Sequence, residues 1–69
     1  MKATFDSMSA ERYEFTHGRR PRGEGCWAFE LRAGDRKRQI FIDATYAEAK
    51  KQALERATQE GYCIVSVLT

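Results

Sequence analysis

The sequence predicts an α+β fold, in which an antiparallel three-stranded sheet carries one helix on one face and a fourth strand follows at the C-terminus, in the order β-β-β-α-β. Three observations lead to this prediction. The first segments alternate apolar and polar residues with a two-residue period, which is typical of strands. A later segment begins with a capping box and repeats its apolar residues every three or four positions, which is typical of a helix. A run rich in Val and Ile ends the chain. With 69 residues, the chain is long enough for one small domain.

The first quarter of the chain divides into an arm and a strand. Residues 1–10 combine Ser, Asp, Thr and Met without periodicity, so we expect a flexible N-terminal arm there and a single small α+β domain over residues 11–69. Residues 12–17 alternate, which predicts a half-buried first strand with Tyr13, Phe15 and His17 on one face. The loop GRRPRGEG, residues 18–25, connects it to the next strand.

Two further strands are predicted on either side of a tight turn. The run CWAFELRA, residues 26–33, alternates most strongly and places Trp27, Phe29 and Leu31 on one face. Gly34 and Asp35 supply the turn. The third strand covers residues 37–43, with its two isoleucines on the face opposite Gln39 and Phe41.

A helix and a last strand complete the predicted fold. Thr45 and Glu48 form a capping box, and the alanines that follow repeat at helical spacing. A face of alanines lets a helix lie close to a sheet, while the larger strand residues supply the volume of the core. Gly61 is placed to end the helix in a left-handed conformation, and the run YCIVSVL, residues 62–68, reads as the final strand.

Charge is distributed unevenly along the chain. The formal net charge is +2, yet residues 12–38 hold eight basic and four acidic groups and therefore carry +4. Residues 1–11 and residues 39–69 each carry −1. A local patch of Lys and Arg is the usual electrostatic footprint of nucleic-acid binding, so the first half of the chain holds the candidate surface.

Several other classes of protein are disfavoured. No apolar run approaches the length of a membrane span and the N-terminus lacks a signal-peptide pattern, so we expect a cytoplasmic protein without a membrane partner. Cys26 and Cys63 lack metal-ligand or redox spacing, and we expect two buried thiols, no metal and no cofactor. His17 is the only histidine and the carboxylates are dispersed, so we expect no enzyme.

The candidate binding residues fall into two basic groups and one aromatic. Arg19, Arg20 and Arg22 lie in the Gly-rich loop, which is either a binding loop whose arginines reach a phosphate or a minor groove, or only a solvated connection between strands. Arg36, Lys37 and Arg38 follow the next turn. Phe41 lies on the face away from the predicted helix, where it can stack on a base or be covered by the arm or by a partner subunit.

The run from Gly25 to Ala57 resembles the three-stranded sheet plus helix of AP2-type DNA-binding domains and of the similar arm-site-binding domains of tyrosine integrases. The resemblance rests on CWAFEL, on the turn GDRKRQ and on the capped helix ATYAEAKKQALERA. In that family the sheet enters the major groove, and basic residues of the strands and turns contact bases and phosphates. The positions of this chain that match are Arg32, Arg36, Lys37, Arg38 and Gln39.

Two functional hypotheses follow. The first is a small nucleic-acid-binding module, with DNA preferred over RNA as the partner, that uses mainly phosphate contacts and acts as an accessory protein of a mobile element. The alternative is a protein-interaction or antitoxin-like adaptor domain, such as a homodimer, that uses a strand edge or the Phe41 face and binds no nucleic acid.

Overall fold

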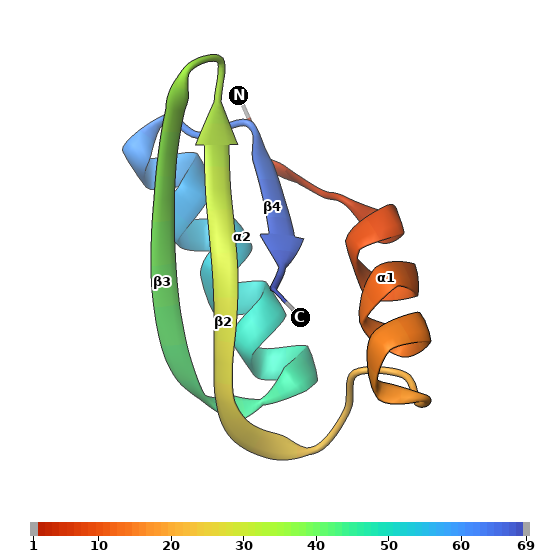
Figure 1. The fold of residues 1–69 in the computed structure, drawn as a ribbon. Helices are drawn as coiled ribbons and strands as arrows, with labels where there is room; N and C mark the ends of the chain where they lie inside the picture. The colour runs from red at the N-terminus through yellow and green to blue at the C-terminus, as the bar shows by residue number, and fades with distance from the viewer. Residues whose placement is uncertain (1, 69) are drawn as a thin grey trace.

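The structure is a computed structural model that describes residues 2–68. Its elements are β1 (Thr4–Phe5), α1 (Ser7–His17), β2 (Glu24–Ala33), β3 (Arg36–Thr45), α2 (Tyr46–Glu60) and β4 (Ile64–Val67) (Figure 1). The four strands form one mixed sheet in the order β1-β4-β2-β3, with β1 parallel to β4 and the other pairs antiparallel. The α+β class is confirmed, whereas the first predicted strand is wrong and a second helix is present.

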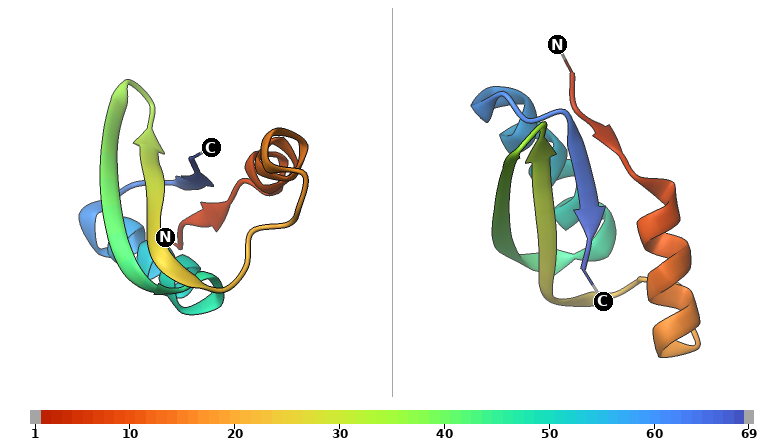
Figure 2. Two further views of the ribbon diagram at one scale, coloured as in Figure 1. Left: turned by 60° about the horizontal axis from the view of Figure 1, so that its bottom comes forward. Right: turned by 45° about the horizontal axis from the view of Figure 1, so that its top comes forward.

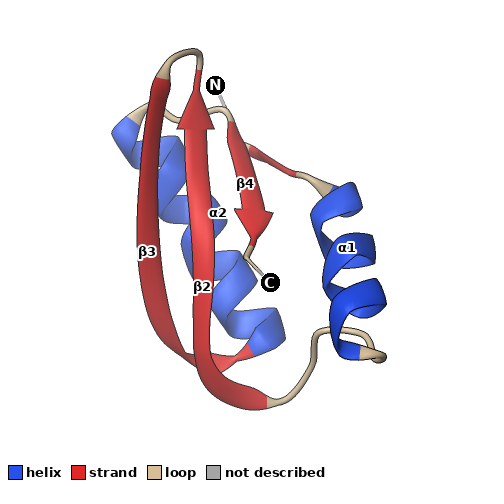
Figure 3. Cartoon of the chain, in the orientation of Figure 1, coloured by secondary structure: helices blue, strands red, loops and turns tan. Residues whose placement is uncertain are grey.

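The core lies between the sheet and α2, which crosses one face of the sheet (Figure 3). Phe29 and Leu31 of β2 and Val65 of β4 are fully buried, and α2 meets them with a stripe of buried alanines, Ala49, Ala53 and Ala57. The small alanine side chains allow the helix to approach the strands closely, so the aromatic and branched residues of the sheet fill the space between the layers. The predicted packing of an alanine face on the sheet is therefore confirmed.

The β2–β3 hairpin fixes which side chains share a face. Each residue from Glu24 to Ala33 has a partner in β3 without a bulge, so Trp27 lies opposite Ile42 and Phe29 opposite Ile40. Gly34 has a φ of 60° and no non-glycine residue among those described has a positive φ, which fits a type II′ turn with Gly at its first central position.

Residues 12–17, which the alternating pattern assigned to a strand, belong to α1. The Asp6 side chain accepts the N–H of Met8 and caps the helix, and Gly18 ends it with a φ of 73°. In a helix, Tyr13 and His17 lie one turn apart, and their rings stack at 4.1 Å. Phe15 points away from the molecule and is 93% exposed, so the alternating pattern of residues 12–17 does not correspond to a buried strand face.

The segment expected to be a flexible arm contains β1 and the start of α1. Thr4 and Phe5 pair with Ile64 and Val65 of β4, and α1 then continues along the same edge of the sheet (Figure 2). The hydroxyl of buried Ser9 accepts the N–H of Val67 at 3.0 Å. Because β1 ends before it reaches Val67, a side chain of α1 takes the place of the backbone carbonyl that a longer β1 would offer to this N–H.

The two cysteines carry free thiols that are exposed, so their predicted burial is wrong. Cys26 lies opposite Asp43 on the sheet face away from the core residues, and Cys63 lies in the connection between α2 and β4. No helix within residues 2–68 is long and apolar enough to cross a bilayer.

Candidate nucleic-acid interface

The basic residues that follow the β2–β3 turn divide between the two faces of β3. Because side chains alternate along a strand, Arg36 and Arg38 point to the same side as buried Ile40, where α2 lies, and Lys37 points to the opposite side. The sequence prediction treated these three residues as one group. The structure brings Arg36 and Arg38 together and separates Lys37 from them.

Arg36, Arg38 and Arg56 gather around Glu60 at the C-terminal end of α2, and we call these four residues the hairpin cluster. Glu60 Oε1 accepts from Arg38 Nη1 at 2.6 Å, and Glu60 Oε2 accepts from Arg56 Nε at 2.9 Å. The backbone carbonyl of Glu60 accepts from Arg36 Nη2 at 3.2 Å. The Arg36 guanidinium also lies over the Tyr62 ring, 4.7 Å from its centroid. The cluster thus holds three guanidinium groups in place from two different elements.

The electrostatics of the hairpin cluster favour an anion. The hydrogen bond from Arg56 and the positive charges of Arg38 and Arg56 lower the pKa of Glu60, although partial desolvation acts in the other direction. The negative end of the α2 dipole stabilises the arginine side chains at this position, although it opposes a bound anion. One carboxylate faces three guanidinium groups, so positive charge remains after the internal ion pairs are counted.

Sequence reasoning missed Arg56, Glu60 and Tyr62 as neighbours of the hairpin arginines. Arg56 and Glu60 stand four residues apart on a predicted helix, which is an ion-pair spacing that the sequence displays. Their position beside β3 depends on how α2 crosses the sheet, and no local pattern encodes that crossing.

The loop arginines Arg19, Arg20 and Arg22 lie at the other end of β2 (Figure 1). All three are exposed, and Arg20 Nε lies 3.7 Å from Glu14 Oε2 in an ion pair between two solvent-exposed side chains. The loop joins β2 at Glu24, whereas the hairpin cluster begins beyond its last residue, Ala33. A ten-residue strand spans roughly 33 Å, so the two basic groups do not form one patch.

The open face of the sheet, which we define as the face away from α2, carries charges of both signs. Arg32 Nη2 lies 3.7 Å from Asp6 Oδ2 and 3.4 Å from Ser66 Oγ, and Arg32 Nε lies 3.4 Å from Glu30 Oε1. Gln39 lies opposite Glu30 and remains exposed. The Arg32 charge is therefore neutralised within the fold, which leaves this face without a net attraction for phosphate.

Phe41 is the predicted aromatic of this face, and it is 66% exposed. Its partner in β2 is Ala28, which is too small to cover the ring. A ring that is exposed to this extent is available for contact with another molecule.

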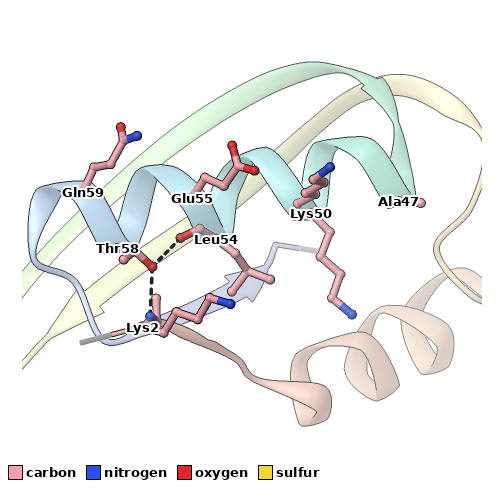
Figure 4. Close-up of a pocket in the computed structure, with 9 residues that line it drawn as sticks. Lys2, Ala47, Lys50, Leu54, Glu55, Thr58 and Gln59 are labelled. Carbon is pink, nitrogen blue, oxygen red and sulfur yellow. Dashed lines mark hydrogen bonds between the residues drawn. The ribbon is translucent and has the colours of Figure 1, made fainter.

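A lysine-rimmed groove runs between α2 and the N-terminal segment (Figure 4). Its volume is about 650 Å³, Leu54 lies at its base, and the rim carries Lys2, Lys50 and Lys51 with one carboxylate, Glu55. The Thr58 hydroxyl, which accepts the Ala3 N–H and donates to the Leu54 carbonyl, closes one end.

Within residues 2–68, no three His, Cys, Asp or Glu side chains gather closely enough to hold a metal ion. Comparisons with known protein families, with curated proteins and with solved structures gave no match for this chain.

Proposed function

We propose that this chain binds nucleic acid, DNA in preference to RNA, through phosphate contacts made by the hairpin cluster. The observation that supports the proposal is the convergence of Arg36, Arg38 and Arg56 on a single carboxylate. Guanidinium groups present several donors in a fixed plane and bind phosphate oxygens in pairs.

The ion pairs with Glu60 prepare the arginines for a ligand. A free arginine side chain loses rotamer entropy when it binds, whereas Arg38 and Arg56 are already held by Glu60 at 2.6 and 2.9 Å. A phosphate that approaches from solvent meets donors that Glu60 does not use.

The test is the salt dependence of binding to a 20-base-pair duplex, measured by fluorescence anisotropy between 50 and 200 mM salt. Each phosphate contact contributes about −0.9 to the slope of log K against log salt concentration. The double variant Arg36→Ala/Arg56→Ala should therefore reduce the slope by about 2. Single-stranded DNA and duplex RNA of the same sequence establish which nucleic acid is preferred.

Lys51→Ala is the control for the single variant Arg36→Ala, because it removes one positive charge from an exposed residue of α2 at the lysine-rimmed groove. It should leave the slope within a few tenths of the wild-type value. Equal effects of Lys51→Ala and Arg36→Ala on the slope would refute the assignment to the hairpin cluster. Binding no tighter than about 10⁻⁴ M to every nucleic acid at 50 mM salt would refute the function itself.

A further inference from the structure

The outer edge of β3 is long and open. The strand covers ten residues, stands last in the sheet order and pairs with β2 along its whole length. Figures 1 and 2 show no element beyond it, and no residue of the described range 2–68 pairs with its outer edge.

The hydrogen-bond pattern identifies the backbone groups that face outward. The N–H of Tyr46 donates to the Gly23 carbonyl, so the backbone groups of even-numbered residues of β3 point toward β2. The N–H and C=O groups of Lys37, Gln39, Phe41 and Asp43 therefore point away from the sheet. The same four residues place their side chains on the open face.

The edge lacks some of the features that usually prevent strand addition, although it does carry the charged residues Arg36, Lys37, Arg38 and Asp43. It has no proline and no bulge, and α2 covers its face but not its edge. Natural sheets commonly protect such an edge with inward-pointing charges, short strands or distortion. Among the four residues whose backbone groups point outward, Lys37 lies at one end and Asp43 at the other. Two copies of this row that run in opposite directions therefore place opposite charges next to each other.

We propose that a second copy of this chain pairs with β3 antiparallel to β3, so that two sheets join into one. In this register Lys37 of each copy lies opposite Asp43 of the other, and Gln39 lies opposite Phe41. The contact is isologous, because a two-fold axis passes between the two copies of Ile40. The pairs of Lys37 with Asp43 and of Gln39 with Phe41 each exchange two N–H···O=C bonds, and the Ile40 pair between them is a non-hydrogen-bonded pair of the antiparallel ladder.

Charge complementarity selects this register over its neighbours. A shift by two residues in one direction places Lys37 opposite Thr45, and a shift in the other direction places it opposite Phe41. Only the proposed register forms both ion pairs of Lys37 with Asp43. It also brings the two Phe41 rings, each 66% exposed, into a diagonal cross-strand contact within the reach of aromatic side chains.

The face that carries α2 is compatible with the same register. Ile40, which is 5% exposed, meets its own symmetry mate, and half-buried Ile42 lies opposite Arg38. On the α2 side the junction therefore contains one apolar contact between the two Ile40 side chains, flanked on each side by a contact of Ile42 with Arg38. This inference does not depend on the proposed nucleic-acid function, because the dimer is held by the outer backbone edge of β3 and by the pairs of Lys37 with Asp43, and of the hairpin cluster only Arg38 lies in the paired row.

The experiment is sedimentation equilibrium of the full chain at several concentrations, with the fold of each variant checked by circular dichroism. Lys37→Asp places like charges opposite each other at both symmetry-related contacts, and so does Asp43→Lys. Each single variant should weaken the dimer by about two- to thirtyfold, since two symmetry-related charge pairs are lost and each contributes roughly 0.2–1 kcal/mol. The double variant Lys37→Asp/Asp43→Lys restores opposite charges and should recover the wild-type dissociation constant.

Lys51→Asp, which makes the same charge change on α2, is the control and should leave the dissociation constant unchanged. A wild-type chain that remains monomeric at millimolar concentration overturns the proposal. A dimer in which the double variant is no tighter than the two single variants overturns the register.

Discussion

Replacing Ser9 by alanine tests whether α1 completes the edge of the sheet. The Ser9 hydroxyl donates to the Asp6 carbonyl at 2.6 Å and accepts the Val67 N–H at 3.0 Å, and the residue is 1% exposed. The variant removes the acceptor and leaves the N–H of Val67 buried without a partner.

The expected loss of unfolding free energy is about 1–3 kcal/mol, which is the cost of leaving one buried polar group unsatisfied. A chain of this size loses about 4–8 °C of Tm per kcal/mol, so a loss in the middle of that range lowers Tm by roughly 8–16 °C. Urea unfolding followed by the fluorescence of Trp27 measures the change, because Trp27 lies in the core and its indole N–H donates to Gly23.

Ser7→Ala is the matched control, since Ser7 is exposed at the start of the same helix. It should change the unfolding free energy by less than about 0.5 kcal/mol. If Ser9→Ala is as mild as Ser7→Ala, the hydroxyl does not serve as the partner of Val67 and the account of this edge is wrong.

Two further predictions concern the core and the hairpin cluster. Ala53→Leu inserts a large side chain where α2 lies against the sheet with no exposed surface, so it should destabilise the fold by about 1–3 kcal/mol in urea unfolding, whereas Gln52→Leu on the exposed side should not. Glu60 has a pKa below its ordinary value of 4.5, so its contribution to stability is present above that value and is lost as pH falls through the lowered pKa. Glu60→Gln should therefore lose less stability than the wild-type chain between pH 7 and pH 3, and an identical loss in both would contradict the ion pairs.

The sequence predicts the hairpin and α2 well because their signals are local. The pairing of Trp27 with Ile42 follows from a two-residue period on both sides of one glycine turn, and the Thr45 side chain accepts the Glu48 N–H as the capping box requires. These elements need little information from distant parts of the chain.

The error over residues 12–17 has a physical cause. A run of only six residues in which apolar and polar side chains alternate is also compatible with a helix. A strand would place Phe15 on the same buried face as Tyr13 and His17, whereas a helix places it on another side. Asp6 as an N-cap and Gly18 as a left-handed C-cap both mark the helix, and both stand outside the segment that alternates. The strand β1 is two residues long and exists because β4 offers it an edge, so no periodicity could reveal it.

For both proposals, the face of β3 to which each basic residue points matters more than the number of basic residues. A two-residue period places Arg36 and Arg38 beside the C-terminal end of α2 and Lys37 on the open face, so residues adjacent in sequence meet different neighbours. Arg36 and Arg38 are held by Glu60, whereas Lys37 lies opposite Arg32 in a row whose other charged end is Asp43. The proposed phosphate contacts use the α2 side of β3, whereas the proposed dimer is held by the outer edge and by Lys37 on the open face, so Lys37→Asp should weaken the dimer while the ion pairs of Glu60 stay intact.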